Sequence, residues 1–355
     1  MPASATRPPE AVIVAGGFGT RLLPLTAKRP KHLLEVGGVP FLEHQISRLA
    51  EVGVGHVVVA TSYHADLFEP VLGDGSRWGI RVDYVEEEQP LGTAGAIRNV
   101  AHALAPDPER AVVILNGDVL SAHDLRAQLD GFESKREGRS VDVSLHLVEV
   151  EDARAFGCVP TDGAGRVTGF VEKSQDPVTR QVNAGCYVFR RRVIDLVPPG
   201  RVVSVERETF PRLVDEGALV VGFVDNAYWR DVGTPQALVA ASRDLVLGTA
   251  SSPAVDAAPA GALVHPGAKV ADSAVVNAGS TVGDAARVEE RAIVAGSVVM
   301  SGAVVRAGVR LHDCVLGPGA MVGGGVVLHG VTIGDDAHVT APVERGQRVD
   351  CDAVL

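Results

Sequence analysis

The stretch AVIVAGGFGTRLLPLTAKRPKHLLEV, residues 11–36, contains the features that decide the fold of the N-terminal half. It begins with an apolar run at residues 11–15, continues with a glycine-rich turn at residues 16–19, and then contains four basic residues between Arg21 and Lys31. A short, β-branched apolar run predicts a strand buried on both faces, and glycines directly after it let the backbone approach a phosphate. We therefore expect a phosphate-binding turn followed by a basic segment.

Two common phosphate-binding motifs do not fit this turn. A P-loop ends in Lys-Ser or Lys-Thr, and no such pair follows Gly16 or Gly17. A dinucleotide-binding fingerprint needs a third glycine where Leu22 stands. Arg21 follows the turn at once, and a guanidinium can bind phosphate oxygens through two donors. Lys31 can reach the same phosphates if the intervening segment loops back.

The first 245 residues alternate strand-like and helix-like patterns. Apolar runs predict strands at residues 11–15, 56–60, 81–85 and 111–118. A helix is predicted over residues 40–51, with Pro40 in its first turn and Leu42, Ile46 and Leu49 on one face. A second helix is predicted to begin near Thr93 as its N-cap. Strands alternating with helices indicate a mostly parallel α/β sheet.

The C-terminal part has a different repeat. Residues 248–262 are rich in Ala, Ser and Pro and resemble a linker. An aliphatic residue then recurs every six positions, at Val264, Val270, Val276, Val282, Val288, Val294 and Met300, and a later phase contains Leu316, Val322 and Leu328. A six-residue period predicts a parallel β-helix in which each short strand is one side of a coil.

Composition limits the possible partners. The formal net charge of -11 argues against general nucleic-acid binding, which needs a basic surface. No apolar run has the length of a membrane span, and the N-terminus has no signal-peptide core. The four cysteines are scattered, without a CxxC pair, so a zinc site is not expected. Their scatter instead indicates a reducing compartment, and we expect a cytoplasmic location.

The glycine-rich stretch resembles the motif of sugar-1-phosphate nucleotidylyltransferases, G-G-x-G-T-R-L-x-P-L-T-x-x-x-P-K. Further blocks that are similar to those of this family follow in the same order: EEEQPLGTAGAI (86–97), LNGDVL (115–120), FGCV (156–159), FVEKS (170–174), NAGCYVF (183–189), VSVERETFP (203–211) and YWRDVGTP (228–235). The resemblance covers nearly the whole chain. One departure is His32, which follows the motif lysine where relatives commonly carry Pro or Gln; we leave it out of the site.

The resemblance implies a fold and a domain organisation. We expect a Rossmann-like α/β nucleotidyltransferase domain over residues 1–245, with a mostly parallel mixed sheet, and a linker over residues 246–262. A left-handed parallel β-helix of hexapeptide repeats is expected over residues 263–355. The left-handed sense comes from the resemblance, since the period alone does not give it. The β-helix is expected to form a homo-oligomer.

The resemblance also implies a reaction, in which a sugar-1-phosphate oxygen attacks the α-phosphorus of a nucleoside triphosphate and pyrophosphate leaves. Both reactants are anions, so the protein must neutralise charge and align the attack. The catalytic residues implied are Arg21, Lys31 and Asp118. Asp118 and Asp231 are implied as ligands of Mg²⁺, an ion that prefers hard oxygen donors.

The remaining site residues fall into two groups. Ala15, Gly16, Gly17, Gly19, Thr20, Glu87, Glu88 and Gly92 are expected at the nucleotide. Gly157, Glu172, Lys173 and Asn183 are expected at the sugar phosphate, with Lys173 binding the phosphate and Glu172 the ring hydroxyls.

Together with the β-helix tail, the motif blocks most resemble those of family members that use GTP and mannose-1-phosphate. The acidic run at residues 86–88 favours guanine as the base. Guanine presents two N–H donor groups on its Watson–Crick edge, which suits a carboxylate, and Glu87 is the preferred reader with Glu88 next. The alternatives are thymidylyl, uridylyl or adenylyl transfer to glucose-1-phosphate, a heptose-1-phosphate substrate, an additional acyltransferase activity, or a non-catalytic regulatory subunit. The presence of every catalytic residue type favours an active enzyme.

Overall fold

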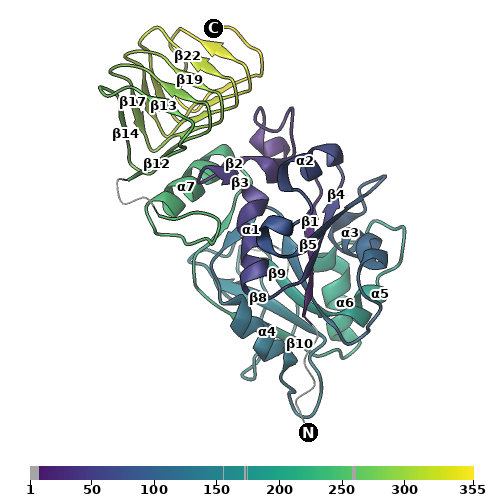
Figure 1. Cartoon of the computed structure of the whole chain (residues 1–355). Coiled ribbons are helices and arrows are strands. Elements are labelled where there is room, and N and C mark those ends of the chain that lie inside the picture. Colours follow the sequence, from purple (N-terminus) through teal and green to yellow (C-terminus); the bar gives the residue numbers. More distant parts are fainter. Residues whose placement is uncertain (1–7, 155, 172, 174, 258–260) are drawn as a thin grey trace. The chain divides into compact units, whose positions relative to one another are not determined.

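The structure is a computed structural model that describes residues 8–154, 156–171, 173, 175–257 and 261–355 (Figure 1). It divides into two compact units. Unit 1 comprises the chain up to Gly17 together with Arg48–Trp229, and unit 2 comprises Phe18–Ser47 together with Arg230–Leu355. The boundary between the units falls within the glycine-rich stretch: Gly16 and Gly17 belong to unit 1, whereas Arg21 and Lys31 belong to unit 2.

Among the described residues, seven strands form the sheet of unit 1, in the order β10-β8-β9-β6-β1-β4-β5. They are β1 (Glu10–Ala15), β4 (His56–Thr61), β5 (Arg81–Glu86), β6 (Ala111–Asn116), β8 (Val143–Glu149), β9 (Gln181–Arg190) and β10 (Val220–Val224). β1 runs parallel to both β4 and β6, whereas β9 is antiparallel to β6 and β8. The predicted strands and the mostly parallel mixed sheet are confirmed.

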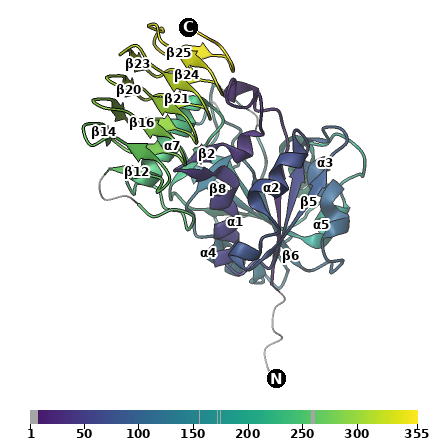
Figure 2. The same ribbon diagram turned by 45° about the horizontal axis from the view of Figure 1, so that its top comes forward.

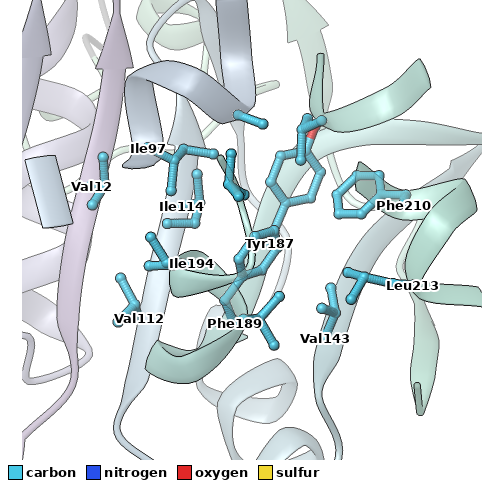
Figure 3. Packing of buried hydrophobic residues seen from close by; sticks show 14 of the residues in the cluster. Val12, Ile97, Val112, Ile114, Val143, Tyr187, Phe189, Ile194, Phe210 and Leu213 are labelled. Carbon is cyan, nitrogen blue, oxygen red and sulfur yellow. The ribbon is translucent and has the colours of Figure 1, made fainter. Parts of the chain in front are cut away.

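Helices cover this sheet with apolar side chains. α3 (Gly92–Asn99), α5 (Arg191–Asp195) and α6 (Phe210–Asp215) supply Ile97, Ile194 and Phe210 to a core that also contains Val12 of β1 (Figure 3). The Tyr187 and Phe210 rings meet edge to face, with their centroids 5.0 Å apart. Full burial of one such side chain stabilises the fold by about 1.5–3 kcal/mol. The core therefore fixes the strand ends from which the site residues project.

The remaining helices and short strands complete the α/β part. They are α1 (Phe41–Glu51), α2 (Phe68–Leu72), α4 (Leu125–Glu133), α7 (Pro235–Val246), β2 (Glu35–Val36), β3 (Val39–Pro40), β7 (Val119–Ser121) and β11 (Trp229–Asp231). Within the described residues, no helix combines the length and the apolar character needed to cross a bilayer.

Both predicted helices are present, but the roles predicted for Pro40 and Thr93 at their starts are wrong. Pro40 ends β3 and is not in the first turn of α1, because it pairs with Glu35 of β2. Thr93 lies inside the first turn of α3 and is not its N-cap. Its hydroxyl instead donates to Glu206 at 3.0 Å and accepts from the backbone N–H of Val205 at 2.8 Å. A side chain held by these tertiary partners does not cap its own helix.

The C-terminal strands form a parallel β-helix with three sheets, and its stacked coils are consistent with the left-handed sense expected (Figure 2). Its strands are β12 (Ala262–Val264), β13 (Lys269–Val270), β14 (Val275–Asn277), β15 (Ser280–Val282), β16 (Arg287–Val288), β17 (Ile293–Ala295), β18 (Val298–Val299), β19 (Val304–Val305), β20 (Arg310–His312), β21 (Val315–Leu316), β22 (Met321–Val322), β23 (Val327–His329), β24 (Thr332–Ile333), β25 (His338–Val339) and β26 (Arg348–Val349).

The coils shorten along the β-helix, which corrects the predicted register. Val264 pairs with Val282, eighteen residues later, but Val282 pairs with Val299, only seventeen residues later. Val299, not Met300, therefore continues the inward row of the core. The cause is the turn after β17, where Gly296 alone, at φ 56°, replaces two turn residues of the preceding coil. The next coil is equally short, since Val299 pairs with Leu316 seventeen residues later, and this explains the later phase of the repeat.

Candidate active site

The start of the glycine-rich turn lies at the carboxyl end of β1. Gly17 has φ +98°, a left-handed conformation that favours glycine, and its N–H donates to Ser62 Oγ at 3.3 Å. A Cβ added to Gly16 would lie 3.4 Å from Ser62 Oγ and 4.0 Å from Glu87 Oε2. Ala15 is buried. The turn therefore presents its backbone beside the side chain of Glu87.

Glu87 is a buried carboxylate with an unused acceptor. Only 8% of the residue is exposed, and Oε2 accepts from the backbone N–H of Leu91 at 3.4 Å. No described residue donates to the buried Oε1. Burial raises the pKa of Glu87, because the charged form loses solvation. The neighbouring Glu88 is exposed. Of the two acidic candidates, only Glu87 has a buried acceptor that no described residue uses.

Gly92 fixes the start of α3 against a second segment. It has φ +71°, and an added Cβ would lie 2.7 Å from the carbonyl oxygen of Val203. That same oxygen accepts from the N–H of Ala94 at 3.0 Å, and the N–H of Val203 donates to Leu91 at 2.8 Å. The turn that follows Glu87 is thus bound to residues 203–206.

Asp118 lies at the same edge of the sheet of unit 1. β6 ends at Asn116, which pairs with Val14 of β1, and the N–H of Gly117 donates to the carbonyl of Val14 at 2.9 Å. Asp118 follows in the turn before β7 and is partly exposed. A carboxylate beyond the carboxyl end of a parallel strand is where α/β folds bind ligands.

A cavity of about 460 Å³ opens in unit 1, a volume suited to a sugar phosphate. It is lined by Asn116, Phe156, Gly157, Cys158, Val159, Phe170, Val171, Asn183, Ser204, Glu206, Arg207 and Pro211. Two predicted sugar-side residues, Gly157 and Asn183, are therefore brought together. Lys173 is exposed and is not among the lining residues, and Glu172 lies outside the described residues.

Sequence reasoning missed Glu206, which projects into this cavity from a π-helix over Val205–Thr209. Its carboxylate accepts from Ser204 Oγ at 2.9 Å, from Thr93 Oγ1 at 3.0 Å and from the Tyr187 hydroxyl at 3.4 Å. Asn183 Nδ2 in turn donates to the Tyr187 hydroxyl at 2.8 Å. Single-turn π-helices are frequent at functional sites. The only signal in the sequence was an acidic residue inside the block VSVERETFP.

In unit 2, Arg21 lies next to Asp231. Arg21 Nη2 is 3.8 Å from Asp231 Oδ2, and the two side chains are 65% and 46% exposed. A Cβ at Gly233 would overlap the Arg21 guanidinium, so that glycine leaves room for it. Arg21 and Thr20 belong to a 3-10 helix over Thr20–Leu22 and are exposed. Both side chains of this pair are open to solvent.

The segment between Arg21 and Lys31 loops back, as predicted. A Cβ added to Gly19, which has φ +61°, would lie 3.1 Å from Thr26 Cγ2 and 3.2 Å from Lys31 Cβ. Thr26 Oγ1 donates to the carbonyl of Gly19 at 3.0 Å. The beginning and the end of the segment therefore pack together. His32, which we left out of the site, is buried with 1% exposed.

The acidic residues would suit a metal ion that takes some of its ligands from the bound substrate. Within the described part of the chain, no group of three or more His, Cys, Asp or Glu side chains could hold a metal. Asp118 and Asp231 offer hard carboxylate oxygens, and Asp231 already faces a cation in Arg21. Mg²⁺ is usually bound by one or two carboxylates together with phosphates and water. Each of these two carboxylates is of the donor type that Mg²⁺ prefers.

Comparisons with known proteins show which proteins this chain resembles. Residues 10–246 match the family model "Nucleotidyl transferase", and residues 260–345 match "GMPPB C-terminal domain". The mannose-1-phosphate guanylyltransferase of Mycobacterium tuberculosis is 50% identical over 285 residues, which are 80% of this chain and 77% of that protein. The mannose-1-phosphate guanylyltransferase catalytic subunit beta of Danio rerio is 36% identical over 64% of this chain and 62% of its own.

Two solved structures share the fold of the first part. HddC from Yersinia pseudotuberculosis, complexed with GMP-PN, is 28% identical, with a TM-score of 0.55 over 65% of this chain and 97% of that chain. A putative glucose-1-phosphate thymidylyltransferase from Bacillus anthracis is 24% identical, with a TM-score of 0.58 over 65% of this chain and 93% of that chain. At that identity the latter bears on the fold alone.

Proposed function

The chain belongs to the nucleotidyl transferase family, and we propose that it transfers GMP from GTP to mannose-1-phosphate, forming GDP-mannose and pyrophosphate. The guanylyltransferase from Mycobacterium tuberculosis, which is 50% identical, supports this choice of substrates. The Yersinia structure in complex with GMP-PN supports a guanine nucleotide.

The observation that carries the guanine assignment is the carboxylate of Glu87. Its Oε1 is buried and receives no hydrogen bond from a described residue, which is costly unless a ligand supplies the donor. Guanine offers N–H groups on its Watson–Crick edge, and such a donor would favour the charged form of Glu87 against the burial that raises its pKa. Glu87 also lies beside the backbone of Gly16, at the nucleotide turn.

The reaction forms one bond and breaks one. A phosphate oxygen of mannose-1-phosphate attacks the α-phosphorus of GTP. The bond between that phosphorus and the α,β-bridging oxygen breaks, and pyrophosphate leaves with the electron pair. Arg21 and Lys31 would bind the triphosphate and offset the charge that grows on the leaving group. Lys173 would bind the sugar phosphate. Glu206 would accept hydrogen bonds from the sugar hydroxyls, and the Asn183 amide would donate to them or accept from them.

Nucleotidyltransferases generally use a divalent metal ion, and we propose Mg²⁺ for this chain. Asp118 and Asp231 would hold it. When bound, the ion would neutralise phosphate charge and polarise the α-phosphate.

We also propose a cytoplasmic homo-oligomer. All four cysteines are free thiols, three of them buried, which suits a reducing compartment. Val275 and Val327 are exposed in one outward-facing row of the β-helix and offer apolar side chains for contact with a second copy.

Isotope labelling tests the reaction class. With GTP labelled at the α-phosphate, mannose-1-phosphate and Mg²⁺, the label should appear in GDP-mannose, whereas label at the γ-phosphate should appear in pyrophosphate. Release of inorganic phosphate in place of pyrophosphate would contradict the proposal.

A further inference from the structure

The basic segment, defined as residues 18–34, is held by charged contacts to the last coils of the β-helix in the same unit. Arg29 Nη1 and Nη2 donate to the two carboxylate oxygens of Asp335 at 3.0 and 2.6 Å. Asp335 is only 2% exposed. A bidentate pair that is shielded from water holds its geometry far better than an exposed ion pair.

Two more acidic residues continue this surface. Lys28 Nζ lies 3.1 Å from a carboxylate oxygen of Asp336 and 3.0 Å from one of Asp352. Asp352 belongs to the next coil, and its backbone N–H donates to the carbonyl oxygen of Asp335 at 2.9 Å. We call Asp335, Asp336 and Asp352 the acidic corner. Neighbouring basic residues of the segment thus face acidic residues of two successive coils.

Backbone contacts reach the part of the segment that carries Arg21. Arg348 Nη2 donates to the carbonyl oxygen of Arg21 at 2.9 Å. The Cys351 thiol lies 3.5 Å from the carbonyl oxygen of Pro24 and donates to it. Beyond the other end of the segment, Glu35 accepts from Ser301 Oγ at 2.5 Å. The β-helix therefore contacts the segment along its length.

The segment has little regular structure of its own. Its two 3-10 helices, Thr20–Leu22 and Lys31–Leu33, are single turns. A single turn is not stable by itself, because too few hydrogen bonds offset the conformational entropy lost. The conformation that packs Gly19 against Lys31 must therefore be fixed largely by tertiary contacts.

We infer that Arg29 and Asp335 are positioning residues for nucleotide transfer, and that the acidic corner of the β-helix holds Arg21 and Lys31 in the conformation that receives the triphosphate. This inference rests on the role proposed for Arg21 and Lys31. It gives the β-helix a part in the reaction of its own chain, separate from any contact with a second copy.

The test combines hydrogen exchange with kinetics on the full-length protein. Asp335→Asn keeps the size of the side chain and removes its charge. Without substrate, the amides of residues 18–34 should exchange faster than in the wild type. With substrates, the KM for GTP should rise about tenfold or more, because small displacements of binding groups are costly, while the KM for mannose-1-phosphate should stay within about twofold.

A matched variant is Glu289→Gln, which breaks the ion pair between Glu289 and Arg306, 2.7 Å apart, within the β-helix. It should change neither the exchange of the segment nor the KM for GTP. If Asp335→Asn lowers only the melting temperature and leaves the exchange and the KM for GTP as in the wild type, the inference is wrong. A wild-type protein that transfers no GMP would contradict the proposed function alone, because the exchange measurement needs no substrate.

Discussion

At the residue scale, the residues proposed for the site differ in how directly the sequence points to them. Gly17 and Glu87 are found from local patterns, since a glycine after a buried strand and a carboxylate before a turn have direct physical meanings. Glu206 is not found in this way, because its partners Thr93 and Tyr187 are distant in the sequence. Nothing local distinguishes it from a solvent-facing glutamate.

Replacing Glu87 by Gln should weaken the preference for guanine. The Gln amide keeps one acceptor but replaces the other with an NH₂ donor. That donor would face the N1–H and N2–H donors of guanine and could not pair with them. Loss of one well-placed hydrogen bond to a base costs about 1–3 kcal/mol, so kcat/KM for GTP relative to dTTP should fall about 10- to 100-fold. Steady-state kinetics with each nucleotide measures this ratio. Glu86→Gln, at an exposed neighbour, is the control; an unchanged ratio in Glu87→Gln would exclude Glu87 as the base reader.

Replacing Asp118 by Asn should abolish most Mg²⁺-dependent turnover while leaving the fold intact. The side chain is partly exposed in a turn, so its loss affects the site more than the core. Removing a metal ligand typically weakens metal affinity or activity at least 10- to 100-fold, by analogy with changes to outer-shell partners. Rates measured across a Mg²⁺ titration test this, with circular dichroism as the check on folding. Wild-type rates at low Mg²⁺ would refute the metal role.

At the element scale, continuous apolar runs predicted the strands well, because β1, β4 and β6 are buried on both faces. The helix starts were less predictable, since Thr93 is bound by Glu206 and Pro40 by a two-residue hairpin. The hexad period predicted the β-helix, but not the shortened turn at Gly296. A single residue in the left-handed conformation can replace two, and no hydrophobic period reveals such a change.

Gly92→Ala should disrupt the start of α3. The residue has φ +71°, and the new Cβ would lie 2.7 Å from the carbonyl oxygen of Val203. Backbone strain of this kind costs about 1–3 kcal/mol, and we expect the turn after Glu87 to shift and the KM for GTP to rise. Gly131→Ala in α4 is the matched control, because its Cβ meets nothing within 4 Å; it should be neutral or stabilising by up to about 1 kcal/mol. Urea unfolding compares the two, and equal effects would contradict this explanation.

Two buried histidines of unit 1 should make the protein less stable in mild acid. His123 and His146 stack with their ring centroids 3.8 Å apart, and burial lowers the pKa of His123 to about 2 and that of His146 to about 4. The unfolded chain takes up these protons near pH 6.5 and the folded protein does not, so the free energy of unfolding should fall as the pH falls from 6.5 towards 4. The slope is up to about 1.4 kcal/mol per pH unit for each histidine.

Urea unfolding at pH 7, 6 and 5 tests this, with the double variant His123→Gln/His146→Gln for comparison. The wild type should lose stability more steeply with acid than the variant does. Equal slopes in the two proteins would show that these histidines do not control the acid response.

At the scale of the whole molecule, the sequence predicted the two kinds of fold but not how the basic segment is held. Lys28 and Arg29 appeared only as basic residues near a phosphate turn, yet their partners Asp336 and Asp335 are about 300 residues away in the chain. No local pattern connects residues at that separation. The net charge of -11 does not reveal this arrangement either, because a net charge does not show which acidic residues pair with which basic ones.

The central claim is that this chain is a guanylyltransferase for mannose-1-phosphate. The most direct test measures initial rates of pyrophosphate release with GTP, ATP, UTP and dTTP, each paired with mannose-1-phosphate and with glucose-1-phosphate. We predict that GTP with mannose-1-phosphate has the highest kcat/KM, by about 100-fold or more, because guanine alone among these bases presents two adjacent N–H donors to the Glu87 carboxylate. A preference for dTTP or UTP with glucose-1-phosphate would contradict the assignment.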